Sequence, residues 1–291
     1  MTELGEKSIY QKRVRKSDQL LKGLIYLAAV LSIALLVGIM AYVFVRGIPQ
    51  LSWTFLSTVQ SAKRGTFGIL GNIVNTLYII VVTLVIAAPV GIGSAIYLNE
   101  YAKPGKLVRL IEFTTEILSG IPSIIFGLFG MVFFGATLHL GYSILTGSFT
   151  LTLMVLPLIT RNTQEALKTV PDSYRSGALG IGATKWYMIR TILLPSAMPG
   201  ILTGIILSIG RIVGESAALL FTAGSGFQLP KSLFGKLFES SGTMTIQLYL
   251  SMQKAKYDQA FGIAVVLLLV VLGINFLTRY LTSRFDVTKL K

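Results

Sequence analysis

Two ionisable residues stand inside a long apolar stretch of the chain. Arg211 and Glu215 lie four residues apart in SAMPGILTGIILSIGRIVGESAALLF, residues 196–221, so an unbroken helix would place them one turn apart on one face. Ser208 precedes them and Thr222 follows them. Ionisable groups at membrane depth are costly and usually face a partner, a cavity or a pathway. We interpret these four residues as the lining of a substrate pathway.

The chemistry of the pair favours a small anion as the substrate. A planar guanidinium matches the oxygens of a tetrahedral oxyanion and stays charged at physiological pH. A neighbouring Glu215 would compete for Arg211 and weaken the hold, and conduction requires release as well as entry. The competing interpretation is that the two charges only neutralise each other so that the helix can insert. The order Arg before Glu is the weaker orientation at this spacing, which favours the pathway.

The polar segment 161–195 predicts two short helices joined by a tight turn. Pro171 biases Val170 away from helix, so the incoming helix should end near Thr169. Asp172 or Ser173 can cap a new helix that runs to about Leu179. Gly180 and Gly182 allow a tight turn, and a second helix is expected from Ala183 to Leu194, before Pro195 interrupts it.

The composition indicates a membrane protein that spans the bilayer several times. The chain has 291 residues, of which 53% are hydrophobic and 13% are charged. It has no Cys and only one His, His139, so disulfides, thiol chemistry, metal clusters and a catalytic triad are not expected. No phosphate-binding loop motif occurs, so ATP with its Mg²⁺ would have to bind to another chain, and this chain itself is expected to hold no cofactor or metal and to catalyse no reaction.

The hydropathy predicts a single all-α membrane domain with six spans. Most of the 26 Lys and Arg residues fall in segments assigned to one side, which by the positive-inside rule is the cytoplasm and holds both termini. The basic surplus is therefore attributed to topology rather than to nucleic-acid binding. A cytoplasmic segment 1–23 would precede a membrane domain 24–281, with its core at 72–281, and a cytoplasmic tail 282–291. The expected spans are residues 24–45, 72–98 (broken near Pro89 and Gly91), 117–138, 143–160, 196–221 and 260–279.

The segment 161–195 resembles the cytoplasmic EAA loop of bacterial ABC importer permeases, whose pattern is E-A-A-x3-G-x9-I-x-L-P. Gly182, Ile192, Leu194 and Pro195 match this pattern in register, and Ala178 matches its third position. Ser176 and Gly177 stand where the motif has Glu and Ala. In this family the loop docks on the ATPase subunit. The resemblance assigns coupling to the ATPase to Asp172, Tyr174, Arg175, Ser176, Gly177, Ala178, Gly182, Ile192, Leu194 and Pro195.

A second resemblance narrows the substrate. The sequence GRIVGESAALL at 210–220 resembles the G-R-A-x-G-E-T-A-P-L segment of phosphate importer permeases, and the chain from Asn72 to Phe221 resembles the A-type subunit of that pair. Ser216 and Ala218 replace the usual Thr and Pro, so a straighter helix is expected above Glu215. The resemblance implies a type I importer fold of the methionine-permease kind, with Arg211 and Glu215 on the phosphate path. It also implies a C-type permease, two ATPase subunits and an external phosphate-binding protein as partners in the inner membrane.

Three alternatives stay open. Within the same class, a permease for sulfate or molybdate would also suit a path lined by arginine. A secondary transporter or channel that uses Arg211 and Glu215 as a proton-linked site is the alternative from another class. An integral-membrane enzyme is disfavoured, because the chain offers one His, no Cys and no cluster of acids.

Overall fold

The structure is a computed structural model that describes residues 16–61, 65–103 and 105–285. The chain divides into two compact units, Met1–Arg46 and Gly47–Lys291. The described part of the first unit consists of one long helix, α1 (Lys16–Gly47), whose side chains are almost all exposed. Its apolar segment is long enough to cross a bilayer, since about 20 residues suffice.

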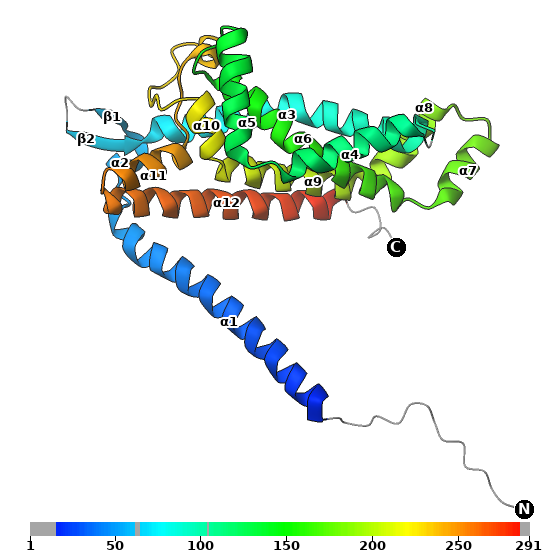
Figure 1. Cartoon of the computed structure of the whole chain (residues 1–291), viewed down its shortest axis with the longest axis horizontal. Helices are drawn as coiled ribbons and strands as arrows, with labels where there is room; N and C mark the ends of the chain where they lie inside the picture. The colour runs from blue at the N-terminus through cyan, green and yellow to red at the C-terminus, as the bar shows by residue number, and fades with distance from the viewer. Residues whose placement is uncertain (1–15, 62–64, 104, 286–291) are drawn as a thin grey trace, which may run out of the picture. The chain divides into compact units, whose positions relative to one another are not determined.

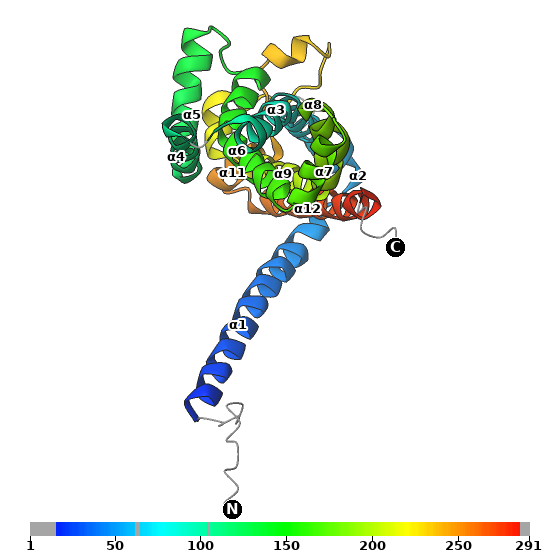
Figure 2. The ribbon, with the colours of Figure 1, turned by 90° about the vertical axis from the view of Figure 1, so that its right-hand side faces the viewer.

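The second unit is built on four long helices that lie side by side. They are α3 (Leu70–Ile96), α6 (Ile144–Lys168), α9 (Leu194–Gly214) and α12 (Tyr257–Phe285). Figure 1 shows them lengthwise and Figure 2 shows the bundle from its end. Among the described residues, five helices are long and apolar enough to span a membrane, or six if one bent pair counts as a span. This agrees with the predicted all-α membrane bundle.

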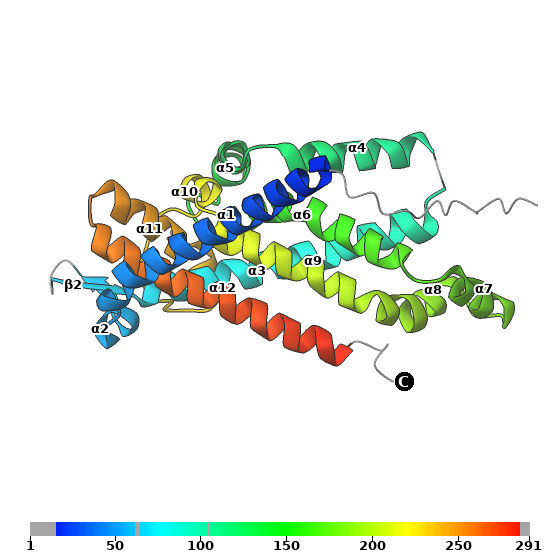
Figure 3. The same ribbon diagram turned by 90° about the horizontal axis from the view of Figure 1, so that it is seen from below.

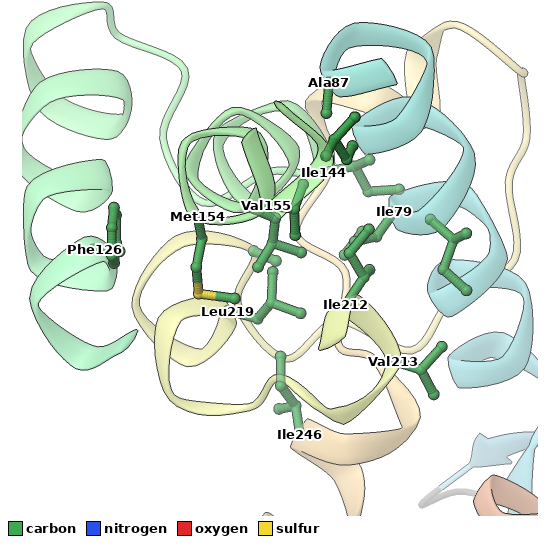
Figure 4. Close-up of a cluster of buried hydrophobic side chains, with 14 residues drawn as sticks. Ile79, Ala87, Phe126, Ile144, Met154, Val155, Ile212, Val213, Leu219 and Ile246 are labelled. Atoms are coloured by element: carbon green, nitrogen blue, oxygen red, sulfur yellow. The ribbon is translucent and has the colours of Figure 1, made fainter. Parts of the chain in front are cut away.

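The core of the bundle lies where α3, α6 and α9 meet. Ile79, Val155 and Ile212 are each at most 2% exposed and pack there in one apolar cluster (Figure 4). Small residues bring α9 close to α6, because a Cβ atom on Gly200 would lie 2.5 Å from the Ala166 Cβ atom. Helices in a bilayer associate by this kind of close packing rather than by exclusion of water.

The predicted third span, residues 117–138, is not one straight helix that begins at residue 117. The helix α4 already begins at Lys106 and ends at Gly120, and α5 (Ser123–Gly130) continues as the π-helical segment η3 (Met131–Thr137). The two helical parts are bent by 102°, and Figure 1 shows α5 turned across the direction of α4. The bend lies at Ile121 and Pro122, which are both extended, because a residue before proline is driven out of the helical region.

The predicted second span, residues 72–98, is continuous where a break was expected. A break was expected near Pro89 and Gly91, but α3 continues through both residues and passes into the π-helical segment η2 (Tyr97–Tyr101). Gly91 is the point at which α3 approaches α6, since a Cβ atom there would lie 2.7 Å from a methyl group of Ile159. Pro89 has no N–H and so cannot make the usual backbone hydrogen bond of the helix. The close packing of α3 against α6 at Gly91, two residues later, supports the helix there.

One end of the bundle carries short elements that the sequence did not predict. They are η1 (Ile48–Gln50), α2 (Trp53–Ser57), the antiparallel strands β1 (Val59–Ser61) and β2 (Thr66–Ile69), α10 (Ala217–Thr222), η5 (Gly235–Phe238) and α11 (Met244–Gln253). The long connection after α10 is held on α3 by two buried amides: Asn72 Nδ2 donates to the Gly242 carbonyl at 2.9 Å, and Asn75 Nδ2 donates to the Gly226 carbonyl at 3.0 Å. We call this the hairpin end.

The opposite end carries the predicted pair of short helices, α7 (Asp172–Gly180) and α8 (Lys185–Met188). Both lengthwise views place α7 and α8 at one end of the bundle and α2 with β2 at the other end (Figures 1 and 3). We call residues 161–195 the coupling segment. Because α6 enters this segment and α9 leaves it, any force on it acts directly on two of the four long helices.

Candidate functional site

The helix that carries Arg211 ends three residues beyond it. The helix α9 stops at Gly214, and Glu215 has an extended backbone with φ −78° and ψ 127°. Its side chain is directed to the next helix, where Oε1 accepts a hydrogen bond from the Ala218 backbone N–H at 3.0 Å. The expected straighter helix above Glu215 is therefore wrong. The missing proline does not straighten the chain, because the buried carboxylate of Glu215 caps α10 instead.

Arg211 and Glu215 therefore do not form the predicted pair on one helical face. Arg211 is exposed whereas Glu215 is only 8% exposed, and no ion pair joins them in the part of the chain that the structure describes. The interpretation that the two charges merely neutralise each other finds no contact to support it. The two side chains have different tasks, since one caps a helix and the other is free to meet a ligand.

Arg211 lines a cleft that contains several charged side chains. The cleft has a volume of about 420 Å³ and lies between the end of α3 and the helices α4, α6 and α9. It also contains two further basic side chains, both from α6, and three carboxylates, two of them from α4. These residues are Arg161, Lys168, Glu112, Glu116 and Glu165. The sequence did not predict that these residues share one site, because the third span was expected to begin only at residue 117 and most of α4 precedes it.

Ser208 and Thr222 do not open onto this cleft. Both side chains are fully buried, and each hydroxyl donates to a carbonyl one turn earlier in its own helix: Ser208 to Gly204 at 2.9 Å and Thr222 to Ala218 at 2.8 Å. Thr222 also packs tightly against α5, since a Cβ atom on Gly130 would lie 2.9 Å from its methyl group. The structure thus brings only Arg211 of the four predicted pathway residues to an open surface.

The exposed side of α9 continues on both sides of Arg211. Leu207, Gly210 and Gly214 share it, at the spacing of one helical face. Gly210 and Gly214 lie one turn apart, and a Cβ atom on either would meet nothing within 4 Å, in contrast to Gly200 and Gly204, which pack against α6. A face with glycine one turn apart permits close approach of another helix.

The coupling segment folds largely as predicted. The helix α6 ends at Lys168, and α7 begins at Asp172 directly after Pro171. The predicted cap by Asp172 or Ser173 is wrong, because Pro171 is the N-cap and no side chain bonds there. Gly182 has φ +82°, a conformation that residues with a side chain rarely adopt. Thr184 caps α8 by accepting a hydrogen bond from the Tyr187 N–H at 3.3 Å.

The expected interruption at Pro195 is wrong. The chain is helical from Lys185 to Gly214, because α8 passes through the π-helical segment η4 (Ile189–Leu193) into α9. In a π-helix each backbone N–H bonds to the carbonyl five residues earlier instead of four. The wider turn moves the carbonyl of the preceding turn away from the proline ring, so the helix can continue. The coupling segment is therefore continuous with α9 and has no break between them.

The predicted coupling residues divide into an interior set and a surface set. Ala178 is 4% exposed, and Ile192 and Leu194 pack in the same cluster, which also contains Leu167 and Met188. The surface set is exposed and consists of Asp172, Tyr174, Ser176, Gly177, Gly182 and Pro195. Other exposed apolar side chains lie beside them, namely Leu179, Ile181, Trp186 and Tyr187.

Arg175 faces inward and pairs with Glu100, a residue that was not among the predicted site residues. Its guanidinium donates to Glu100 Oε1 from Nη2 at 3.0 Å and from Nε at 3.3 Å. Glu100 belongs to η2, and its side chain is only 5% exposed. A carboxylate placed directly after a long apolar segment in a basic stretch was the available signal, because a buried acid requires a cationic partner.

Comparison with known proteins places this architecture in a family. Residues 87–287 match the model of the binding-protein-dependent transport system inner membrane component. The chain is 39% identical over 72% of its length to the probable ABC transporter permease protein YqgI of Bacillus subtilis, of which it covers 71%. It is 34% identical over 87% of its length to the phosphate transport system permease protein PstA 2 of Mycobacterium bovis, of which it covers 83%.

The fold is also that of a solved importer. The chain superimposes with a TM-score of 0.66 on a bacterial ABC transporter involved in the import of the acidic polysaccharide alginate, with 18% identity, over 93% of this chain and 97% of that one. The chain belongs to the family of binding-protein-dependent transport system inner membrane components, as a PstA-like ABC permease.

Proposed function

We propose that this permease subunit belongs to an ATP-driven importer of inorganic phosphate and forms half of its translocation path. The observation that carries the proposal is the position of Arg211, exposed on α9 and open to a cleft with charged side chains, without an ion-pair partner among the described residues. A guanidinium in this state can offer a planar pair of donors to two oxygens of a tetrahedral anion. Relatives named as phosphate transport permeases support the choice of anion.

The cleft supports release as well as binding. Arg161 and Lys168 on α6 would give a passing anion further cationic contacts. Glu165 competes for Arg161, since its Oε1 lies 3.5 Å from Arg161 Nε, and Glu112 and Glu116 of α4 add negative charge to the same cleft. Conduction requires binding that is weak enough to permit exit. The competing role predicted for Glu215 is thus better suited to Glu165 and the other carboxylates of the cleft.

The remaining half of the path would come from a C-type permease. The exposed face of α9 with Gly210 and Gly214 is a suitable surface for it, because both glycines are open. Two ATPase subunits, which bind ATP and Mg²⁺, would dock on the surface set of the coupling segment, and an external phosphate-binding protein would deliver the anion at the hairpin end. This chain would lie in the inner membrane with both termini in the cytoplasm and would itself hold no cofactor.

Uptake by the full complex in proteoliposomes tests the substrate. The purified chain, its C-type partner, the ATPase and the binding protein are reconstituted, and uptake of radiolabelled phosphate is measured with and without ATP inside the vesicles. Phosphate uptake that needs ATP, and that excess sulfate or molybdate does not reduce, is the expected result. Preferential uptake of sulfate or molybdate would contradict phosphate as the substrate, and uptake without an ATPase would favour a secondary transporter.

Cysteine labelling tests the orientation on this Cys-free chain. A probe at Lys185 should react with an impermeant reagent only after the cells are opened, whereas a probe at Phe234, which is 80% exposed near the hairpin end, should react in intact cells. Lys236, also expected on the outer side, is fully buried and so is unsuitable as a probe. Lys12 and Lys289, which the six-span topology places in the cytoplasm, and Lys63, which it places outside, lie outside the described residues. Labelling of position 185 in intact cells would contradict the orientation.

A further inference from the structure

The π-helical segment η2, at the end of α3, contacts both short helices of the coupling segment through two adjacent side chains. Glu100 accepts two hydrogen bonds from Arg175 of α7, at 3.0 and 3.3 Å. The Lys185 ammonium group of α8 lies over the ring of Tyr101 in a cation–π contact, with Nζ 5.0 Å from the ring centre. The two helices on either side of the Gly182 turn are thus both fixed to α3.

Arg175 extends the connection to α6. Its Nη1 donates to the Val170 carbonyl and its Nη2 to the Leu167 carbonyl, both at 2.9 Å. These carbonyls lie at the end of α6, where helical hydrogen bonds run out: besides Arg175, the Leu167 carbonyl accepts from the Val170 N–H, at 3.3 Å. One guanidinium therefore joins the ends of α3 and α6 to α7. Its fifth bond, to Asp172 at 3.1 Å, involves a carboxylate that is 98% exposed.

The Glu100 carboxylate depends on this contact. Its side chain is 5% exposed, and Asn99 Nδ2 also donates to its Oε1 at 2.7 Å. A buried carboxylate that loses its cationic partner is strongly unfavourable, so removing either Glu100 or Arg175 alone should loosen this end of α3. Apolar side chains of α3, Ile92 and Ile96, pack against the interior cluster of the coupling segment beside it.

The covalent connections explain why such a link is needed. The coupling segment is joined by the backbone to α6 and α9, but α3 ends long before it in the sequence. Movement of the coupling segment therefore reaches α6 and α9 through the chain itself, whereas α3 can follow only through side-chain contacts.

We propose that Glu100 and Tyr101 are positioning residues that make α3 move together with the coupling segment when the ATPase subunits close. The proposal rests on the proposed docking of the ATPase to the coupling segment. Glu100 acts through Arg175 and Tyr101 acts through Lys185; neither side chain needs to touch the anion or the ATPase.

The direct test measures how much phosphate is moved for each ATP hydrolysed by the complete complex in proteoliposomes. Glu100→Gln keeps the shape of the side chain and removes its charge, and we expect the ratio to fall about fivefold while the ATPase still co-purifies. Tyr101→Leu should lower the ratio about twofold, and Tyr101→Phe, which keeps the ring, should restore it. Asp258→Asn, at an exposed position in the first turn of α12, is the matched loss of one charge and should change nothing.

A cysteine pair separates coupling from loss of folding. Glu100→Cys with Arg175→Cys removes the ion pair, and a short bifunctional thiol reagent then replaces it with a covalent bridge. The ratio should fall in the double variant and return after bridging. An unchanged ratio in Glu100→Gln, or a bridged pair that stays uncoupled, would overturn the proposal.

Hydrogen exchange tests the Glu100–Arg175 link independently of whether phosphate is the substrate. The amides of residues 92–103 should exchange about tenfold faster in Glu100→Gln than in the wild-type complex, and this measurement needs neither phosphate nor ATP. A wild-type complex that moves no phosphate would refute the proposed substrate, and exchange would still decide the link. Equal exchange rates in the two proteins would overturn the link even where phosphate is transported.

Discussion

Two arginines of this chain lie in contrasting surroundings. Arg175, at the coupling segment, makes five hydrogen bonds, and its side chain is 19% exposed. Arg211, on α9, is exposed, lines a cleft and has no ion pair among the described residues. A guanidinium has five N–H donors, so the first has nothing left to offer a ligand and the second can offer its planar fork. The same residue type thus joins helices in one region, and in the other it is left free for the anion binding proposed above.

Replacing Arg211 should give the largest effect on transport. Arg211→Leu should lower phosphate uptake by at least about 100-fold, since each hydrogen bond to a charged group contributes about 1.5–3 kcal/mol and the fork makes two. Arg211→Lys should also lower it, because a point charge cannot reproduce the planar fork. Uptake is measured in proteoliposomes, with thermal unfolding as the check that the fold is intact. Uptake near the wild-type level in Arg211→Leu would remove Arg211 from the path.

The Gly182 turn offers the next largest effect, at the Arg175 end. Gly182→Leu places a side chain at φ +82°, which costs about 1–2 kcal/mol in backbone strain although the space around it is open. We expect weaker retention of the ATPase during purification, by about tenfold. Gly180→Ala is the matched control, because Gly180 also has open space but ends α7 without positive φ. Equal retention in both variants would contradict the importance of the turn.

Glu215 should affect stability more than transport. Glu215→Leu removes the cap of α10 and should lower the free energy of unfolding by about 1 kcal/mol. Glu215→Gln keeps an oxygen in the same place, so its effect on stability and uptake should be smaller. Chemical denaturation in detergent gives the first quantity and vesicle uptake the second. A loss of uptake in Glu215→Gln as large as in Arg211→Leu would restore the predicted partnership of the two charges.

Ser208 should give the smallest effect. Its hydroxyl is buried and bonded within α9, so Ser208→Ala should change phosphate uptake by less than about twofold. A larger loss, at unchanged stability, would mean that the path passes behind α9 rather than through the cleft of Arg211.

The elements that follow local rules could be predicted from the sequence. Pro171, Gly182 and Thr184 determine where α6 ends, where the chain turns and where α8 begins, because each acts through its own backbone and its nearest neighbours. The long apolar segments likewise predict the spans, since the thickness of the bilayer determines their length.

The features that depend on contacts across the bundle could not be predicted in this way. The break after Gly214 depends on Glu215, whose carboxylate is buried and bonded to α10, and periodicity alone cannot distinguish this from an unbroken helix. The pairing of Glu100 with Arg175 joins residues far apart in the sequence. The cleft could not be predicted either, because α4 was assigned to a loop and only the bend at Pro122 turns it into one wall.

The unbroken course of α3 has a mechanical consequence. With η2 it forms one helix of 32 residues, about 48 Å long at 1.5 Å per residue. Its first turns hold the carbonyls of Gly226 and Gly242 at the hairpin end, and its last turn holds Arg175 at the other end. If the ATPase subunits move the coupling segment as proposed, a tilt of this one long helix would also shift the loop that is bonded to its other end. Work done at the coupling segment would in this way reach the hairpin end through α3.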